Sequence, residues 1–144
     1  MIVKQETGEI SELLTWSQTA IELADGDPTM GDIVFGSPLA LALVFRGIAK
    51  CWLGLADWQK DFRDSLAMAR TTDRLTYSKC VVYKHSVATL QCVLLPDDST
   101  VGEVEEALSI ASDHGDHHAV ALATYCLGGV LLERGGSADR RRGG

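Results

Sequence analysis

The chain has 144 residues, of which 46% are hydrophobic and 23% charged, and its formal net charge is −7. This length suits one domain, and the composition is that of an ordinary globular protein, which excludes a disordered chain, a collagen-like repeat and a disulfide-rich miniprotein. The negative charge argues against a protein that binds nucleic acid through general charge attraction.

The first third of the chain predicts two helices joined by a loop. Apolar residues recur at helical spacing over 9–24, and a Gly- and Asp-rich stretch over 25–36 then predicts a connecting loop. Ser37 and Pro38 suit the cap and first turn of a second helix over 39–53. This helix is apolar nearly all round, so we expect it to be buried on most sides.

The middle of the chain predicts a third helix that begins at residue 57 and a fourth over 76–94. The third has one apolar stripe, formed by Trp58, Phe62, Leu66 and Ala69. The fourth is largely apolar and ends before Pro96. The β-favouring runs at 33–35 and 80–83 are too short or lie within a helical pattern, so no strand is predicted.

Two more helices are predicted in the last third. Thr100 and Glu103 have the spacing of a capping box, which places the start of the fifth helix at residue 100. Asp116 is expected to cap a sixth helix over 119–133. The six helices therefore alternate between amphipathic and largely apolar ones.

The three amphipathic helices share a signature of small, aliphatic, variable, aliphatic and Ala residues at 20–24, 65–69 and 107–111. A period near 40 residues that is carried by helix pairs is typical of an α-solenoid. The sequence predicts an all-α fold with about six helices in antiparallel pairs. One domain is expected over 1–136, followed by a flexible, basic and Gly-rich tail over 137–144.

The predicted sixth helix has no helix after it. Each unit of a solenoid buries its apolar face on the next unit, so a terminal unit needs a polar cap. Three arrangements stay open: the last helix packs back on the core, a partner covers it, or the chain is part of something longer.

The segments 8–28, 36–70 and 94–140 resemble one region of a known family, most specifically in GSPLALA at 36–42 and PDD at 96–98. This is the tetratricopeptide-like helical repeat region of large actinobacterial, especially mycobacterial, signalling ATPases. Some members carry an adenylate cyclase domain and others a LuxR-type DNA-binding domain. The resemblance implies a short right-handed tetratricopeptide-like solenoid that senses or binds proteins without catalysis.

The chain departs from this family in what it lacks. It contains no phosphate-binding GxxxxGK[ST] loop, no cyclase domain and no helix-turn-helix. ATP hydrolysis, cyclic-AMP synthesis and DNA binding therefore do not carry over to it. The chain is expected to be a stand-alone or truncated relative of the repeat region.

Targeting signals and disulfide patterns are missing from the sequence. The first residues have no apolar run with a cleavage site, and the longest apolar stretch, 39–55, is interrupted by Arg46 and Lys50. We expect a cytoplasmic protein that does not enter a membrane. The four cysteines lie in apolar helical patterns and none is in a CxxC pair, so they are expected to be reduced and structural.

Two polar loops are candidates for metal binding, and we favour a structural role for both. The segment 113–118 contains Asp113, His114, Asp116, His117 and His118. Its position predicts a surface turn that ends one helix and caps the next, although His and Asp are common metal ligands. The segment 25–36 begins like a calcium loop, but it lacks the acid, Gly and Glu required at later positions.

Several isolated His, Trp and Arg residues could have either a functional or a structural role. His85 lies within a helix beside Ser86, which does not face it, so no catalytic pair is predicted. Trp52 and Trp58 are expected in the core or between repeats, whereas Trp16 lies off its helix's main stripe and is our candidate for an exposed partner contact. The basic residues of the tail are expected to fray. They are Arg134, Arg140, Arg141 and Arg142.

The sequence therefore predicts a non-enzymatic interaction module with no catalytic, cofactor-binding or metal-binding residues. Its expected partner is another protein or further copies of the chain, bound along its grooves and open end, rather than nucleic acid. The first alternative is a small-molecule sensor with a pocket between the inner helices. The second is a small hydrolase or metal enzyme, which rests on the His-rich turn alone.

Overall fold

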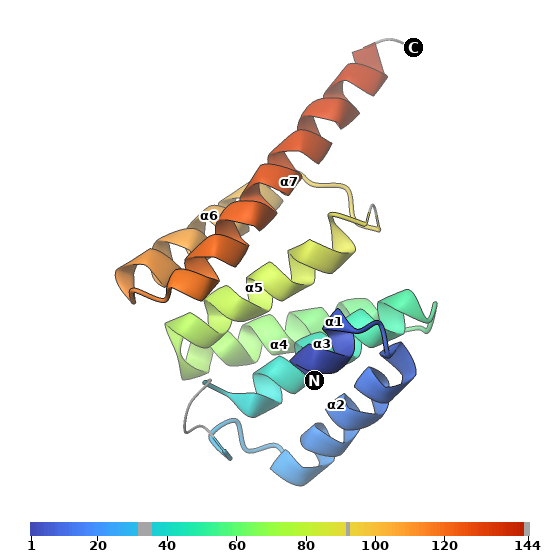
Figure 1. Ribbon diagram of the computed structural model, residues 1–144, viewed down its shortest axis with the longest axis vertical. Coiled ribbons are helices and arrows are strands. Elements are labelled where there is room, and N and C mark those ends of the chain that lie inside the picture. Colours follow the sequence, from blue (N-terminus) through green and yellow to red (C-terminus); the bar gives the residue numbers. More distant parts are fainter. Residues whose placement is uncertain (32–35, 92, 143–144) are drawn as a thin grey trace.

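Helices make up most of the chain in a computed structural model, which describes residues 1–31, 36–91 and 93–142, with side chains up to residue 136 (Figure 1). No strand occurs within these ranges, so the predicted all-α class is confirmed. The β-favouring run at 33–35 lies outside them, and the run at 80–83 is helical. The helices are α1 (Ile2–Glu6), α2 (Ile10–Ala24), α3 (Pro38–Trp52), α4 (Trp58–Thr72), α5 (Arg74–Ala88), α6 (Asp98–Asp113) and α7 (His117–Arg142).

Polar side chains cap the first turns of α3, α5 and α7. The Ser37 hydroxyl accepts a hydrogen bond from the backbone N–H of Ala40, and Pro38 occupies the first turn of α3 as predicted. Asp73 accepts from the N–H of Thr76 at the start of α5. Asp116 accepts from the N–H of Ala119 at 2.9 Å, so the predicted cap of the last helix is confirmed.

The predicted capping box of Thr100 and Glu103 is wrong by one turn. The box is formed by Asp97, whose carboxylate accepts from the N–H of Thr100, while the Thr100 hydroxyl accepts from the N–H of Asp97. Helix α6 therefore begins at Asp98. Glu103 is free to point toward α5, where it forms an ion pair with Lys84.

Helix α5 is shorter than the predicted range 76–94. It begins two residues earlier because Asp73 caps it, and it ends at Ala88. The residues that follow form turns in which the Ala88 carbonyl accepts from the N–H groups of Val93 and Leu94. The apolar pattern continues past the helix because Leu94 in this turn still packs against the core. Hydrophobic spacing alone therefore overestimates the length of the helix.

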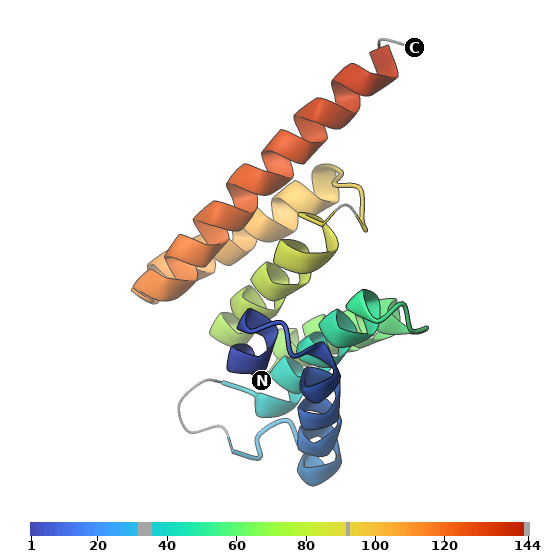
Figure 2. The ribbon, with the colours of Figure 1, turned by 45° about the vertical axis from the view of Figure 1, so that its right-hand side comes forward.

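Helix α7 is longer than the predicted range 119–133, and the segment 137–142 of the predicted flexible tail is helical (Figure 2). The pair of glycines at 135–136 lies within this helix. A glycine lowers helix stability by about 1 kcal/mol relative to Ala, but it keeps its N–H and does not block the hydrogen-bond ladder as Pro does. The N-terminal helix α1 was not predicted, because five residues are too few to show a helical period.

Consecutive helices pack against each other, and α3 also contacts α5, which in turn contacts α7. We call α3, α5 and α7 the inner helices and α2, α4 and α6 the outer helices. The expectation that α3 is buried on most sides is confirmed, because residues 39–45 and 47–49 are all buried. The other large buried side chains come from α2, α4, α5, α6 and α7, so one core runs through the array.

The pair α3–α4 is held together by polar contacts as well as apolar ones. The Ser65 hydroxyl donates to the backbone carbonyl of Ala40 at 2.8 Å, and both side chains are buried. Arg46 forms an ion pair with Asp61 at 2.7 Å. The contact nearer the start of α3, at Ala40, is made by the later residue of α4, Ser65, so the two helices are antiparallel.

The pair α5–α6 repeats this arrangement at the same positions of the outer helix. The Ser78 hydroxyl donates to the carbonyl of Ala107 at 2.7 Å, and Lys84 forms an ion pair with Glu103 at 2.8 Å. Glu103 and Ala107 lie 42 residues after Asp61 and Ser65, which equals the offset between the sequence signatures of α4 and α6. These positions therefore face the preceding inner helix in both pairs.

Candidate functional site

Helix α7 exposes one face at the end of the helix array. Its opposite face packs on α5 and α6 through Ala119, Ala123, Cys126 and Val130. The exposed face, which we call the α7 face, consists of Ala121, Thr124, Gly128, Leu131 and Leu132. Leu131 is 47% and Leu132 is 78% exposed, and no atom lies within 4 Å of a Cβ built on Gly128. The expectation of a largely buried last helix is therefore wrong for this side.

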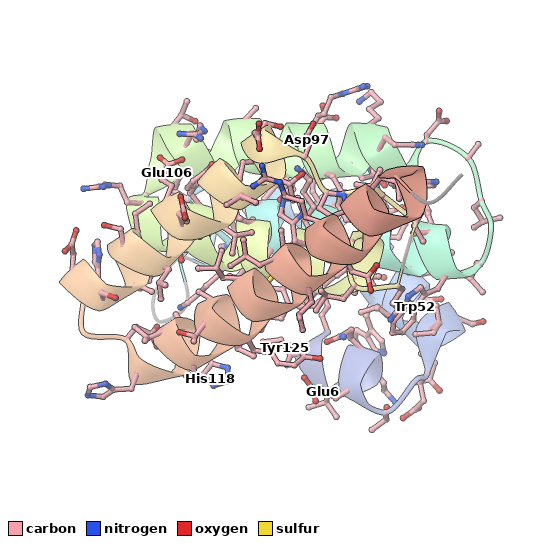
Figure 3. All side chains as sticks on the ribbon, turned by 90° about the horizontal axis from the view of Figure 1, so that it is seen from above. Glu6, Trp52, Asp97, Glu106, His118 and Tyr125 are labelled. Atoms are coloured by element: carbon pink, nitrogen blue, oxygen red, sulfur yellow. The ribbon has the colours of Figure 1, made fainter. Side chains whose placement is uncertain are left out.

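Tyr125 lies at the edge of the α7 face and is 68% exposed. Figure 3 shows it on the same side of α7 as His118, and on the side of the molecule that carries Glu6 of α1. An exposed Tyr, two exposed Leu residues and a helical glycine on one helix form a surface on which another apolar surface can pack closely. The sequence predicted that this helix has no partner, but the exposed residues became identifiable only from its packing.

Helix α2 exposes a second apolar surface, at the other end of the array. Its main stripe packs on α3 through Leu13, Ser17 and Ala24. Beside this stripe, Trp16 is 57% and Leu23 is 70% exposed. We call Trp16, Ala20 and Leu23 the α2 face. The exposure predicted for Trp16 is confirmed, and its role in binding stays a prediction.

A pocket of about 240 Å³ lies where α1, α3, α5 and α7 meet. Most of its lining is apolar, and an ion pair between Lys79 and Asp116 at 3.6 Å lies at its polar side. Burial raises the pKa of the Tyr83 phenol in its wall, so this group stays neutral and presents a hydrogen-bond donor. The lining side chains include Ile2, Leu41, Val82, Tyr83, Ala119 and Leu122.

His85 is buried, as expected for a structural histidine, and lies between Thr89 and Glu103. Its Nδ1 is 2.9 Å from the Thr89 hydroxyl oxygen, and its Nε2 is 2.8 Å from the Glu103 carboxylate. The carboxylate accepts only, so we assign the ring proton to Nε2. The hydrogen bond from His85 and the ion pair with Lys84 lower the pKa of Glu103 to about 2, and burial lowers that of His85. Thr89 is 1% exposed, so its hydroxyl is not accessible to a substrate.

Asp61 is the one buried carboxylate among the described residues, and it is held by two cations of α3. Arg46 donates two hydrogen bonds to it, and the Lys50 ammonium lies 2.8 Å from its second oxygen. Burial alone would raise the pKa of Asp61, but these partners outweigh burial and lower it. The signal in the sequence is the i, i+4 pair of cations within an otherwise apolar helix, which calls for a buried acid opposite.

The His-rich turn has the structural role that its position predicted. The His114 ring lies 2.8 Å from the carbonyl of Ile110, and Asp116 caps α7 and contacts Lys79. His117 and His118 lie in the first turn of α7 and are exposed. Within the described ranges no group of three or more His, Cys, Asp or Glu side chains is arranged to hold a metal ion.

The remaining candidates of the sequence analysis also lie in structural positions. In the loop after α2, Asp27 binds the N–H and hydroxyl of Thr29 within its own turn. Trp52 and Trp58 are half-buried against the core, and Trp58 packs edge-on against Phe62. Arg134 pairs with Asp98, and residues 140–142 lie in the last turn of α7.

Three of the cysteines lie within the described residues, and none of these three forms a disulfide. Cys80 and Cys126 are buried, and burial raises the pKa of each thiol to about 12, so both stay protonated. Cys51 is half-buried. Cys92 lies outside the described residues.

Comparisons of the chain with protein-family models, with curated proteins and with solved structures find no match. In the described part of the chain, no helix combines the length and the apolar character that crossing a membrane requires. The resemblance to the repeat region of signalling ATPases therefore stays a prediction, and function is argued from the geometry of the chain itself.

Proposed function

We propose that the chain is a non-enzymatic, tetratricopeptide-like helical-repeat module that binds a protein through its exposed helix faces. The matching contacts of α3–α4 and α5–α6, and the alternation of outer and inner helices, support a short right-handed solenoid. The resemblance to the repeat region of signalling ATPases favours a role in signal transduction and transcriptional regulation.

The observation that carries this proposal is the α7 face. Fully burying a Leu side chain is favourable by about 1.5–3 kcal/mol, so a partner that covers this face gains a stabilisation that the isolated chain does not have. Repeat arrays use such surfaces to bind along their length or at their ends. No step of catalysis is needed to account for this arrangement.

Capture of partners with the whole chain as bait tests this function. Cross-linking in a lysate of the source organism, followed by quantitative mass spectrometry, should identify a protein that Tyr125→Glu/Leu132→Glu no longer captures. Leu95→Glu is the matched control, because Leu95 is 68% exposed but lies in the turn before α6. The proposal fails if both variants capture the same proteins as the unmodified chain.

The second candidate function is a small-molecule sensor, and the pocket between the inner helices favours it. Its volume of about 240 Å³ and apolar lining suit a small, largely apolar compound. A compound that binds there raises the melting temperature through mass action. Leu122→Trp, which places a larger side chain in the pocket wall, should abolish the rise, and no rise across a broad metabolite panel would contradict the sensor.

A further inference from the structure

The two ends of the array expose complementary halves of one helix pair. In both complete pairs, the outer helix contacts the preceding inner helix at Asp61 and Ser65 of α4 and at Glu103 and Ala107 of α6, and Met68 and Ile110 lie three residues further along. The signature of α2 lies 45 residues before that of α4, so the equivalent positions in α2 are Trp16, Ala20 and Leu23. Ile110 is 1% exposed, whereas the equivalent Leu23 is 70% exposed, since no inner helix precedes α2 among the described residues.

Helix α7 lacks the opposite half of such a pair. It is the third inner helix, and no outer helix follows it among the described residues. Asp73 caps α5 and Asp116 caps α7, so residues can be matched by counting from these caps. Ser78, which binds α6, then corresponds to Ala121. His85, which also faces α6, corresponds to Gly128.

We propose that copies of this chain associate end to end, with the α7 face of one copy packed against the α2 face of the next. This inference rests on the proposed function and names a second copy of the chain as the partner. In the register of the α5–α6 pair, Trp16 of the second copy lies over Gly128, and Ala20 lies beside Ala121. The indole of Trp16 thus packs over Gly128, which has no side chain and open space around its Cβ position.

The charges at the two ends favour this partner and this direction. Residues 1–31 contain six acidic residues and one basic residue, whereas residues 131–142 contain four basic and two acidic ones. With Trp16 over Gly128, an antiparallel pair places Arg134 of α7 beside the acidic start of α2. Glu9 and Glu12 there share a single cation, Lys4, at 2.5 and 2.7 Å. Opposite net charges therefore meet where the helices pair.

The association is heterologous, since it joins two different surfaces, and it extends into a longer array or closes into a ring. Each copy adds an outer helix to complete the neighbour's last repeat. A two-fold pairing of α7 with α7 would instead bring the basic ends of two chains next to the starts of the same helices, where the one acid, Asp116, already pairs with Lys79. End-to-end association and two-fold pairing of α7 differ in their response to variants of one face, because two-fold pairing of α7 does not use the α2 face.

Complementary variants test the inference by light scattering over a range of concentrations. Trp16→Glu blocks the α2 face and Gly128→Glu blocks the α7 face, and each is expected to lose self-association and stay at the mass of one chain. Mixed in equal amounts, they should form a complex of twice that mass, because each keeps one intact face. Gly102→Glu is the matched control, since Gly102 is also an exposed helical glycine without close neighbours.

Several results would overturn end-to-end association. They are an unmodified chain that stays monomeric at all concentrations, a Trp16→Glu variant that still self-associates, and a mixture that forms no complex although circular dichroism shows both variants to be folded. Leu23→Glu provides a second block of the α2 face if Trp16→Glu fails to fold. A monomeric chain that still captures another protein through α7 would overturn this inference and leave the proposed function standing.

Discussion

Asp61 shows how a single buried carboxylate connects two helices of this protein. It is 1% exposed and lies in the stripe of α4 that packs on α3. Two cations hold it, and their own side chains remain about one fifth exposed, at 18% for Arg46 and 21% for Lys50. The two cations therefore remain in contact with water, whereas the carboxylate of Asp61 is fully enclosed by the protein.

Replacing Asp61 should be among the most destabilising polar substitutions in the chain. Asp61→Asn leaves Arg46 and Lys50 facing each other without an anion, and breaking a buried ion pair costs about 3 kcal/mol or more. Urea denaturation followed by circular dichroism measures the loss. Asp64→Asn is the control, because its pair with Lys60 is exposed and should change stability by about 0.5 kcal/mol or less. Equal effects of the two substitutions would contradict this account.

The contact between His85 and Glu103 predicts a loss of stability in acid. The pKa of Glu103 is lowered from 4.5 to about 2, so its stabilising effect is present above pH 4.5 and is lost as the pH falls toward 2. The pKa of His85 is lowered from 6.5, so folding also weakens as the pH falls below that value. We expect Glu103→Gln to reduce the change in the free energy of unfolding between pH 5 and pH 2, by at most about 3 kcal/mol. An unchanged pH profile in this variant would contradict the contact.

At the scale of the helix, the glycines of this chain have opposite roles. A Cβ on Gly47 of α3 would lie 2.8 Å from the Phe62 ring and 3.2 Å from the Trp58 carbonyl oxygen, so this glycine lets α4 approach α3 closely. A Cβ on Gly128 of α7 would meet no atom within 4 Å. The residue type alone does not distinguish these cases, because the difference lies in the neighbouring helix.

Substituting the two glycines should therefore change stability in opposite directions. Gly128→Ala removes the low helix propensity of glycine and should stabilise the chain by about 0.5–1 kcal/mol, which raises the melting temperature. Gly47→Ala should lower the melting temperature, because the helix pair must separate to fit the methyl group. A stabilising effect of Gly47→Ala would show that α3 and α4 pack less closely than described.

Helix positions were largely predictable from the sequence, whereas helix ends and exposed faces were not. The apolar spacing located all six of the predicted helices, and Ser37 and Asp116 marked their caps correctly. The ends of α5 and α7 were misplaced, because Leu94 continues the apolar pattern in a turn and because Gly135 and Gly136 do not stop a helix. The polar contacts of Asp61 and Glu103 were missed, since they depend on which residues face each other across helices.

At the scale of the whole molecule, the described residues begin their array with an outer helix that has no inner helix before it and end it with an inner helix that has no outer helix after it. The sequence predicted this order of helices, but it did not show whether the end helices pack back on the core or leave an apolar face exposed. The exposed Trp16 and Leu23 at one end, and Leu131 and Leu132 at the other, establish that both ends are uncovered. A helix without its pair partner at each end is the physical basis for proposing a binding module.

The mass of the unmodified chain in solution tests this account most directly. Size-exclusion chromatography with light scattering, over a wide range of concentrations, should give a mass that rises above 15.5 kDa as the protein is concentrated. Added salt should shift the rise to higher concentration, because it screens the opposite charges of the two ends. A mass of 15.5 kDa at every concentration would mean that the exposed faces do not join copies of this chain, and would contradict end-to-end association.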